Sequence, residues 1–100
     1  MDKQVAIYNV VAAIPVGKVC SYGEVAKRAG LPGYARYVGH TMKTLPQQST
    51  IPWYRVLNAQ GKIAFEQGSE NFERQRQALA SEGVLVINGK VNMAKYMWRL

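Results

Sequence analysis

Apolar residues recur at helical spacing in the first part of the chain. Residues 2–14 carry Val5, Tyr8 and Ala12 on one side of a helix. Pro15 ends this stretch, because proline lacks the amide hydrogen that a continuing helix needs. The pattern therefore predicts an N-terminal helix over residues 2–14.

Two further helices are predicted next to each other. Ser21 and Glu24 have the spacing of a capping box, in which each side chain bonds to the backbone amide of the other residue. Gly30 suits the end of the short helix that follows. A second helix is expected over residues 34–45, before Pro46. Its apolar side consists of Tyr34, Val38, Met42 and Leu45.

The opposite side of this second helix is cationic. It consists of Arg36, Gly39, His40 and Lys43. Because Gly39 has no side chain, the backbone of a ligand can come close to this side. Two short helices joined by a glycine-containing connection form a helix-turn-helix pattern, which is also found in helical domains that do not bind DNA. The basic second helix favours contact with DNA.

Short strand patterns flank one more helix in the second half of the chain. Residues 56–63 are expected to form two short strands around a turn. Ser69 is a suitable cap for a helix over residues 70–82. One side of that helix carries Phe72, Arg76 and Leu79.

The dipeptide Asn88-Gly89 is a strong signal for a β-hairpin. It predicts strands over residues 84–87 and 90–93, followed by an aromatic tail, residues 94–100, that packs on the rest of the chain. We therefore expect one domain over residues 1–100, mainly α with short β-hairpins.

Charge is the first indication of function. The 100 residues include 13 Lys and Arg against 6 Asp and Glu, which gives a net charge of +7. Such a balance is typical of domains that bind nucleic acid or another polyanion. Basic residues scattered over the whole surface would explain this net charge equally well, unless they share one face.

The sequence offers few groups for catalysis. It has one cysteine, Cys20, and one histidine, His40, so neither an intramolecular disulfide nor a zinc site of these residues can form. A serine-histidine-aspartate set is not evident, and His40 is expected to face solvent or phosphate. Cys20 has Lys18 nearby but no histidine, and a buried, inert thiol is the favoured interpretation.

No cofactor or metal is implied by these residues. The apolar runs are too short to cross a bilayer, and the first residues lack the blocks of a signal peptide. We therefore expect a cytoplasmic protein. From the residues alone, this is a basic binding module with an aromatic corner at residues 50–56.

Five ordered motifs resemble the DNA-binding domain of the O6-alkylguanine-DNA alkyltransferases. They are residues 14–19, 21–26, 35–39, 51–56 and 82–83. In that family the fourth motif reads Pro-Cys-His-Arg, and its cysteine accepts the alkyl group. Here Trp53 stands at the cysteine position and Tyr54 at the histidine position. This substitution resembles the alkyltransferase-like proteins, which bind alkylated guanine without repairing it.

The resemblance implies a winged-helix-like helix-turn-helix domain of the alkyltransferase C-terminal type, and a role for several residues. Arg36 is the finger that enters the duplex in place of a flipped base, with a phosphate clamp as its alternative role. Tyr22 presses on the DNA backbone, and Glu82 is a structural hydrogen-bond partner. Trp53 lines the lesion pocket, with core packing as its alternative role. The remaining pocket residues by the same resemblance are Tyr54, Arg55, Val56, Phe65 and Glu66.

The sequence also departs from the family pattern, and other functions stay open. Leu45 stands where the family has an asparagine. We expect a monomeric sensor that binds duplex DNA containing O6-alkylguanine in the minor groove and directs it to nucleotide excision repair proteins. The alternatives are a residual alkyltransferase that uses another nucleophile, such as Cys20, and a sequence-specific winged-helix regulator.

Overall fold

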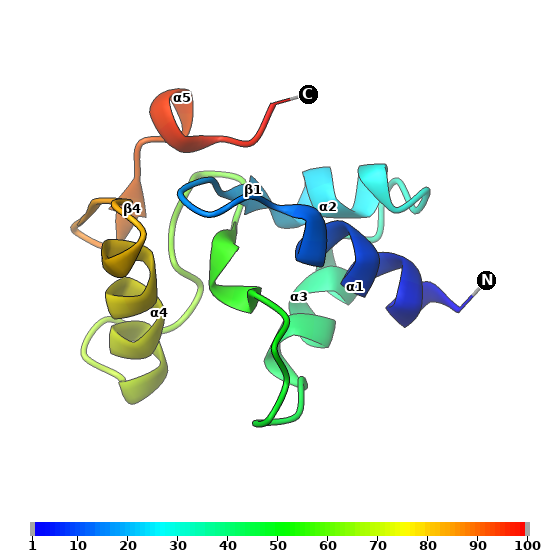
Figure 1. Ribbon diagram of the computed structural model, residues 1–100, viewed down its shortest axis with the longest axis horizontal. Coiled ribbons are helices and arrows are strands. Elements are labelled where there is room, and N and C mark those ends of the chain that lie inside the picture. Colours follow the sequence, from blue (N-terminus) through cyan, green and yellow to red (C-terminus); the bar gives the residue numbers. More distant parts are fainter. Residues whose placement is uncertain (1, 100) are drawn as a thin grey trace.

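Three helices in the N-terminal half pack around one apolar cluster in the computed structural model, which describes residues 2–99 (Figure 1). They are α1 (Lys3–Ala13), α2 (Tyr22–Arg28) and α3 (Ala35–Lys43). The side chains buried between them include Ile7, Val11, Val25, Val38 and Met42. These residues are apolar and lie four positions apart on α1 and on α3, so each of these two helices buries one stripe, to which α2 adds Val25.

The buried side of α1 differs from the predicted one. Ile7 and Val11 are fully buried, whereas Val5 and Ala12 are exposed and Tyr8 is half-buried. Apolar residues surround α1 on all sides, so the sequence pattern does not single out one face. Packing against α2 decides which side is buried.

The helix-turn-helix formed by α2 and α3 begins with only half of the predicted capping box. The Ser21 hydroxyl accepts a hydrogen bond from the Glu24 amide (3.1 Å). The Glu24 carboxylate does not return to Ser21 but forms an ion pair with Arg28, one turn further along the helix (2.9 Å). Gly30 ends the helix with φ at +77°, a conformation that glycine adopts without strain.

The predicted pairing of two strands within residues 56–63 is wrong. β2 (Val56–Leu57) pairs in parallel with β1 (Cys20–Ser21), with Cys20 opposite Val56. The intervening turn does form, because the Asn58 amide bonds to the Lys62 carbonyl oxygen (3.1 Å). β2 instead pairs with a strand from the N-terminal half, where Cys20, Val56 and Leu57 are all buried in the core.

The second half of the chain has its own apolar cluster beneath one helix and one hairpin. α4 spans Glu70–Ser81 and is capped by the Ser69 hydroxyl. Its buried side includes Gln75 in addition to Phe72 and Leu79, whereas Arg76 pairs with Glu73 at the surface. The buried side chains of this cluster include Leu57, Phe72, Leu79, Val84 and Val91.

The hairpin predicted around Asn88-Gly89 is confirmed. β3 (Val86–Ile87) and β4 (Lys90–Val91) are antiparallel, and both turn residues have positive φ, at 52° and 75°. The return strand is shorter than expected, because α5 (Met93–Tyr96) begins at Met93.

The aromatic tail packs on the rest of the chain as predicted, up to Trp98. The amide of Trp98 donates to the Val19 carbonyl oxygen (2.8 Å), and the Arg28 guanidinium lies over the Trp98 ring at 4.1 Å. Leu100, which the prediction included, lies outside the described residues.

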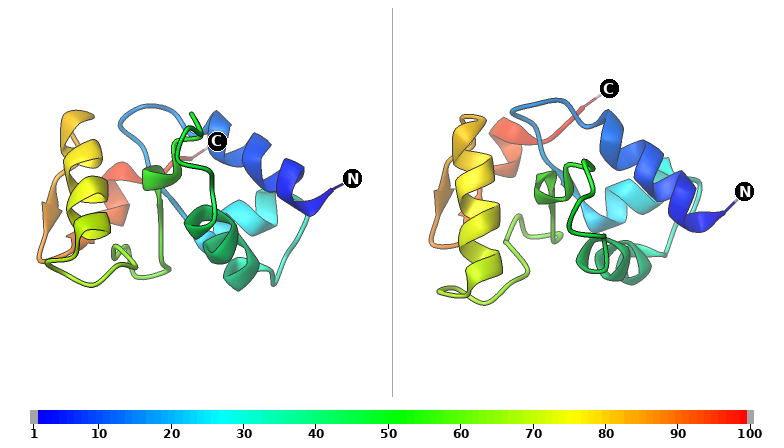
Figure 2. Two further views of the ribbon diagram at one scale, coloured as in Figure 1. Left: turned by 90° about the horizontal axis from the view of Figure 1, so that it is seen from below. Right: turned by 60° about the horizontal axis from the view of Figure 1, so that its bottom comes forward.

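A short 3-10 helix, η1 (Trp53–Arg55), lies between the two halves of the molecule. Figure 2 shows it between α4 on one side and the three N-terminal helices on the other. Its Arg55 bonds to Ile14 in one half and to Glu82 in the other. Within residues 2–99, none of the helices has the length and apolar character that crossing a membrane requires.

Candidate nucleic-acid interface

The exposed side of α3 borders a shallow groove of about 390 Å³, named here the α3 groove. It is lined by Tyr22, Arg36, Gly39, His40, Lys43 and Ala64 together with Ala35. The structure thus brings together all five residues predicted to contact DNA. The basic residues of α3 share one face there, as a polyanion site requires.

Gly39 keeps the floor of the α3 groove low. A Cβ atom at this position would lie 3.8 Å from the Tyr22 ring, which is an ordinary van der Waals contact. The fold would therefore accept an alanine here. The backbone at Gly39 is also helical, so its conformation does not require glycine. The glycine leaves this point of the groove floor without a side chain.

A second cavity, named here the aromatic hollow, adjoins the α3 groove. It has a volume of about 300 Å³, at the lower end of the range for small-molecule sites. Trp53 and Phe65 line it, and their rings meet edge to face with centroids 6.2 Å apart. Trp53 also meets Tyr54 edge to face at 5.9 Å. Such contacts hold the indole in one orientation.

Lys43 belongs to both cavities. It lines the α3 groove and the aromatic hollow, and its ammonium group lies 5.6 Å from the centroid of the Phe65 ring. A ligand that follows the cationic side of α3 therefore reaches the aromatic hollow at Lys43. The hollow has a second cation, Arg74 from α4, and no acidic residue lines it.

Behind the aromatic hollow, Glu82 is the centre of a network of hydrogen bonds. Its carboxylate accepts from the Tyr54 hydroxyl (2.9 Å), from Arg55 Nε (2.9 Å) and Nη2 (2.6 Å), and from the Gly17 amide (3.2 Å). Arg55 also donates to the Ile14 carbonyl oxygen (2.8 Å). The network joins the end of α1, η1 and the end of α4.

The charges of this network are coupled. Burial raises the pKa of Tyr54, and its hydrogen bond to the Glu82 carboxylate raises it further. The hydrogen bond to Glu82 raises the pKa of Arg55. Burial alone would raise the pKa of Glu82, but the hydrogen bonds from Arg55, Gly17 and Tyr54 outweigh it, and the pKa of Glu82 lies below its ordinary value.

Several predicted pocket residues do not line the aromatic hollow. Arg55 is only 8% exposed and is held by Glu82, and Val56 is buried in the core of β1 and β2. Tyr54 points its hydroxyl at Glu82. Glu66 is exposed and does not line the hollow. Four consecutive residues cannot all face one cavity when the first three form a turn of 3-10 helix.

Other residues that line the hollow are not predicted from the sequence. They are Met42, Leu45, Pro46, Gln47, Ser49, Asn71 and Arg74. A helix is predicted over residues 70–82, but nothing in the sequence indicates that Asn71 and Arg74 on this helix approach the end of α3. Such a contact depends on tertiary packing between the two halves.

Cys20 is unsuited to nucleophilic chemistry in this structure. It is fully buried in β1 and lines neither the α3 groove nor the aromatic hollow. Burial raises the pKa of the Cys20 thiol to about 11, so the reactive thiolate is scarce at neutral pH. No group of three or more metal-binding side chains occurs among residues 2–99.

A cationic helix-turn-helix beside an aromatic hollow defines a DNA-binding domain of the alkyltransferase class. The chain belongs to the family described as 6-O-methylguanine DNA methyltransferase, DNA binding domain, whose family model matches residues 2–84. The predicted resemblance and fold class are thereby confirmed.

Three relatives are similar to this chain in sequence. A DNA base-flipping protein of Vibrio parahaemolyticus is 48% identical over 96 residues, 95% of this chain and 94% of that protein. Alkyltransferase-like protein 1 of Schizosaccharomyces pombe is 41% identical over 98 residues, 93% of this chain and 91% of that protein. A methylated-DNA–protein-cysteine methyltransferase of Mycobacterium tuberculosis is 37% identical over 73 residues, but this chain covers only 44% of it.

Solved structures show the same fold. The S. pombe protein in complex with damaged DNA containing O6-carboxymethylguanine superposes with a TM-score of 0.90 at 39% identity, over 98% of this chain and 95% of that one. M. tuberculosis OGT in complex with DNA superposes with a TM-score of 0.70 at 36% identity, over 82% of this chain and 50% of that one.

Proposed function

We propose that the protein is a non-enzymatic sensor that binds O6-alkylguanine in duplex DNA and turns the damaged nucleotide out of the helix. α3 docks in the minor groove, Tyr22 presses on the DNA backbone, and Arg36 fills the space of the flipped base. One observation carries the proposal: Lys43 lines both the α3 groove and the aromatic hollow, so an extruded base has a cavity beside the DNA site. Relatives named for base flipping and solved with damaged DNA support it.

The energy of extrusion favours damaged over normal guanine. Flipping a base costs a few kcal/mol, and least where the base is damaged and pairs poorly. Arg36 is exposed on α3 and free to reach into the duplex. Stacking on an aromatic side chain returns about 1–3 kcal/mol per base, which Trp53 and Phe65 supply in the hollow.

The hollow holds the lesion without reacting with it. Trp53 takes the place of the family's acceptor cysteine, and Tyr54 takes the place of its histidine. The one cysteine of the chain is buried elsewhere with a raised pKa, which speaks against a residual alkyltransferase. The bound lesion therefore persists. The protein acts as a cytoplasmic monomer without a cofactor, and its complex with DNA hands the lesion to nucleotide excision repair proteins.

The test pairs a binding measurement with a mass measurement. The protein is titrated onto two duplexes of one sequence, with and without O6-methylguanine, and we expect tighter binding of the damaged duplex that weakens steeply with salt. The intact protein mass should stay unchanged after incubation. Equal affinities would contradict the sensor, and an added methyl group would show alkyl transfer.

A further inference from the structure

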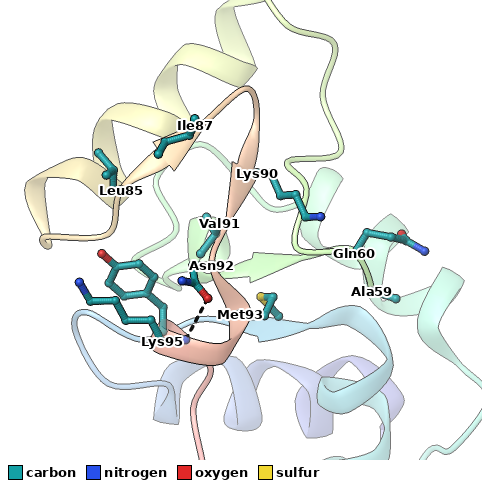
Figure 3. A pocket seen from close by; sticks show the side chains of 10 residues that line it. Ala59, Gln60, Leu85, Ile87, Lys90, Val91, Asn92, Met93 and Lys95 are labelled. Carbon is teal, nitrogen blue, oxygen red and sulfur yellow. Dashed lines mark hydrogen bonds between the residues drawn. The ribbon is translucent and has the colours of Figure 1, made fainter.

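A third cavity, about 670 Å³ in volume, lies between the β3–β4 hairpin and α5, and is named here the hairpin groove. Figure 3 shows Leu85 and Ile87 on one wall, Met93 and Gln60 on the other side, and Val91 and Asn92 between them. It shares no lining residue with the α3 groove or the aromatic hollow. A ligand here does not compete directly with DNA for side chains.

The wall formed by residues 85–87 exposes large apolar side chains. Leu85 is 62% exposed and Ile87 is 61% exposed, whereas their neighbours Val84 and Val86 turn inward to the core. This alternation is that of a strand with one face buried and one face free. Adjacent exposed apolar residues of this size mark surfaces that contact a partner more often than isolated ones do.

The rim of the hairpin groove is positive. Lys90 and Lys95 line it, and none of its other lining residues within the described part of the chain is acidic. Gln60 and Asn92 are the neutral polar groups of the lining. The groove therefore offers apolar contact and two cations, but no group that would attract another cation.

Contacts within the chain hold the walls of the hairpin groove. The Val91 amide donates to the Gly61 carbonyl oxygen (2.9 Å), which fixes β4 against the preceding turn. Gly61 has φ at +79°, and a Cβ there would lie 2.7 Å from Met93 Cγ, so glycine alone permits this close approach. The Asn92 side chain caps α5 by accepting from the Lys95 amide (3.2 Å). A preformed groove loses little entropy on binding.

We propose that the hairpin groove binds an acidic, amphipathic segment of a partner protein. Apolar side chains of the segment cover Leu85 and Ile87, and its carboxylates pair with Lys90 and Lys95. DNA suits the groove less well, because its phosphates offer nothing to the exposed apolar wall. A second copy of this chain suits it less well too, since each copy carries a charge of +7.

This inference goes beyond the proposed function and does not depend on it. The groove is lined by its own residues, so peptide binding can be measured without DNA. With DNA bound, the two sites are expected to be occupied together. A failure of lesion binding and a failure of this docking surface are therefore separate results.

The test uses the full chain, labelled with ¹⁵N, and a synthetic helical peptide with leucine on one face and glutamate on the other. We expect saturable binding with amide shift changes centred on residues 85–96. A twin peptide with lysine in place of glutamate should bind at least about tenfold more weakly, because it meets the two groove lysines with like charge. Binding should persist when the protein is saturated with an O6-methylguanine duplex.

Variants with matched controls locate the site. Ile87→Ser and Lys95→Glu should each weaken peptide binding by roughly five- to tenfold, as losses at the centre of small interfaces do. Val5→Ser and Lys27→Glu change an exposed valine and an exposed lysine outside the groove and should leave binding unchanged. All four positions are exposed, and thermal unfolding verifies that each variant is folded.

Four outcomes would overturn the proposal. They are the absence of saturable binding, shift changes centred outside residues 85–96, equal binding of the twin peptide, and losses in the control variants as large as in the groove variants. An undamaged duplex that shifts the same amides would assign the groove to DNA. Self-association of the chain that Ile87→Ser abolishes would assign it to a second copy.

Discussion

The hydroxyl of Tyr54 donates a hydrogen bond of 2.9 Å to the carboxylate of Glu82, which lies 28 residues further along the chain. The same carboxylate binds Arg55 through two nitrogens. Tyr54 therefore ties the wall of the aromatic hollow, through its edge-to-face contact with Trp53, to the ion pair between the two halves of the molecule. The relation assigns Tyr54 a supporting position behind the hollow.

Replacing Tyr54 with phenylalanine distinguishes a role in supporting Trp53 from direct contact with the damaged base. Tyr54→Phe keeps the ring against Trp53 and removes the two hydrogen bonds of the hydroxyl, which donates to Glu82 (2.9 Å) and accepts from Arg55 (3.5 Å), so unfolding should need about 1 kcal/mol less free energy. The preference for an alkylated duplex should change by less than about threefold, which corresponds to roughly 0.6 kcal/mol of binding free energy. Chemical denaturation and duplex titrations measure the two effects. Loss of the preference in a variant of normal stability would show that the hydroxyl contacts the base.

Glu82 makes the stability of the fold sensitive to acid. Its folded-state pKa lies below the ordinary value of about 4.3, so the ionised form stabilises the folded state above that pH. This contribution is lost as pH falls through the folded-state pKa. The wild type should therefore lose stability steeply below about pH 4.3, whereas Glu82→Gln, which starts lower at pH 7, should have a flatter profile. Denaturation midpoints between neutral pH and pH 3 measure this; parallel profiles would contradict it.

Gly39→Ala is expected to change stability and binding in opposite directions. Alanine in a helix interior is favoured over glycine by about 0.5–1 kcal/mol, and the added methyl group makes only ordinary contact with Tyr22. The same methyl group raises the floor of the α3 groove, so affinity for all duplexes should fall. Thermal unfolding and titration of an undamaged duplex test both halves. A variant that is more stable and binds DNA normally would show that the groove floor does not approach the ligand.

Arg74 is expected to influence which alkyl group is accepted. Lys43 and Arg74 line the aromatic hollow, and no acidic residue does. Because Arg74 is exposed, Arg74→Gln should lower affinity for an O6-carboxymethylguanine duplex by about threefold and for an O6-methylguanine duplex hardly at all. Arg76→Gln is the matched control on the same helix, since Arg76 pairs with Glu73 away from the hollow. Equal losses for the two lesions would contradict the assignment.

The local parts of this fold follow from the sequence. Ser69 and Gly83 delimit α4, Gly30 ends α2, and Asn88-Gly89 forms its hairpin turn, because each depends on backbone conformations that only neighbouring residues decide. The prediction that α3 has a cationic side is likewise confirmed, because helical periodicity alone places these residues on one face.

The contacts between distant parts of the chain could not be predicted from the sequence in this way. β2 was expected to pair with the next strand in sequence but pairs with β1, which no local pattern indicates. The predicted pocket residues 53–56 form consecutive positions of η1 and β2 and therefore point in different directions. Arg74 reaches the hollow only because α4 packs beside η1. Such contacts are decided by tertiary packing, which one sequence does not encode in any local motif.

The central claim is that the damaged base lies in the aromatic hollow. It is tested most directly by isotope-filtered NMR of the protein bound to a duplex whose O6-methylguanine carries a ¹³C-labelled methyl group. We expect nuclear Overhauser contacts from that methyl group to the ring protons of Trp53 and Phe65, which line the hollow. A tight complex in which the methyl group contacts neither ring would contradict it.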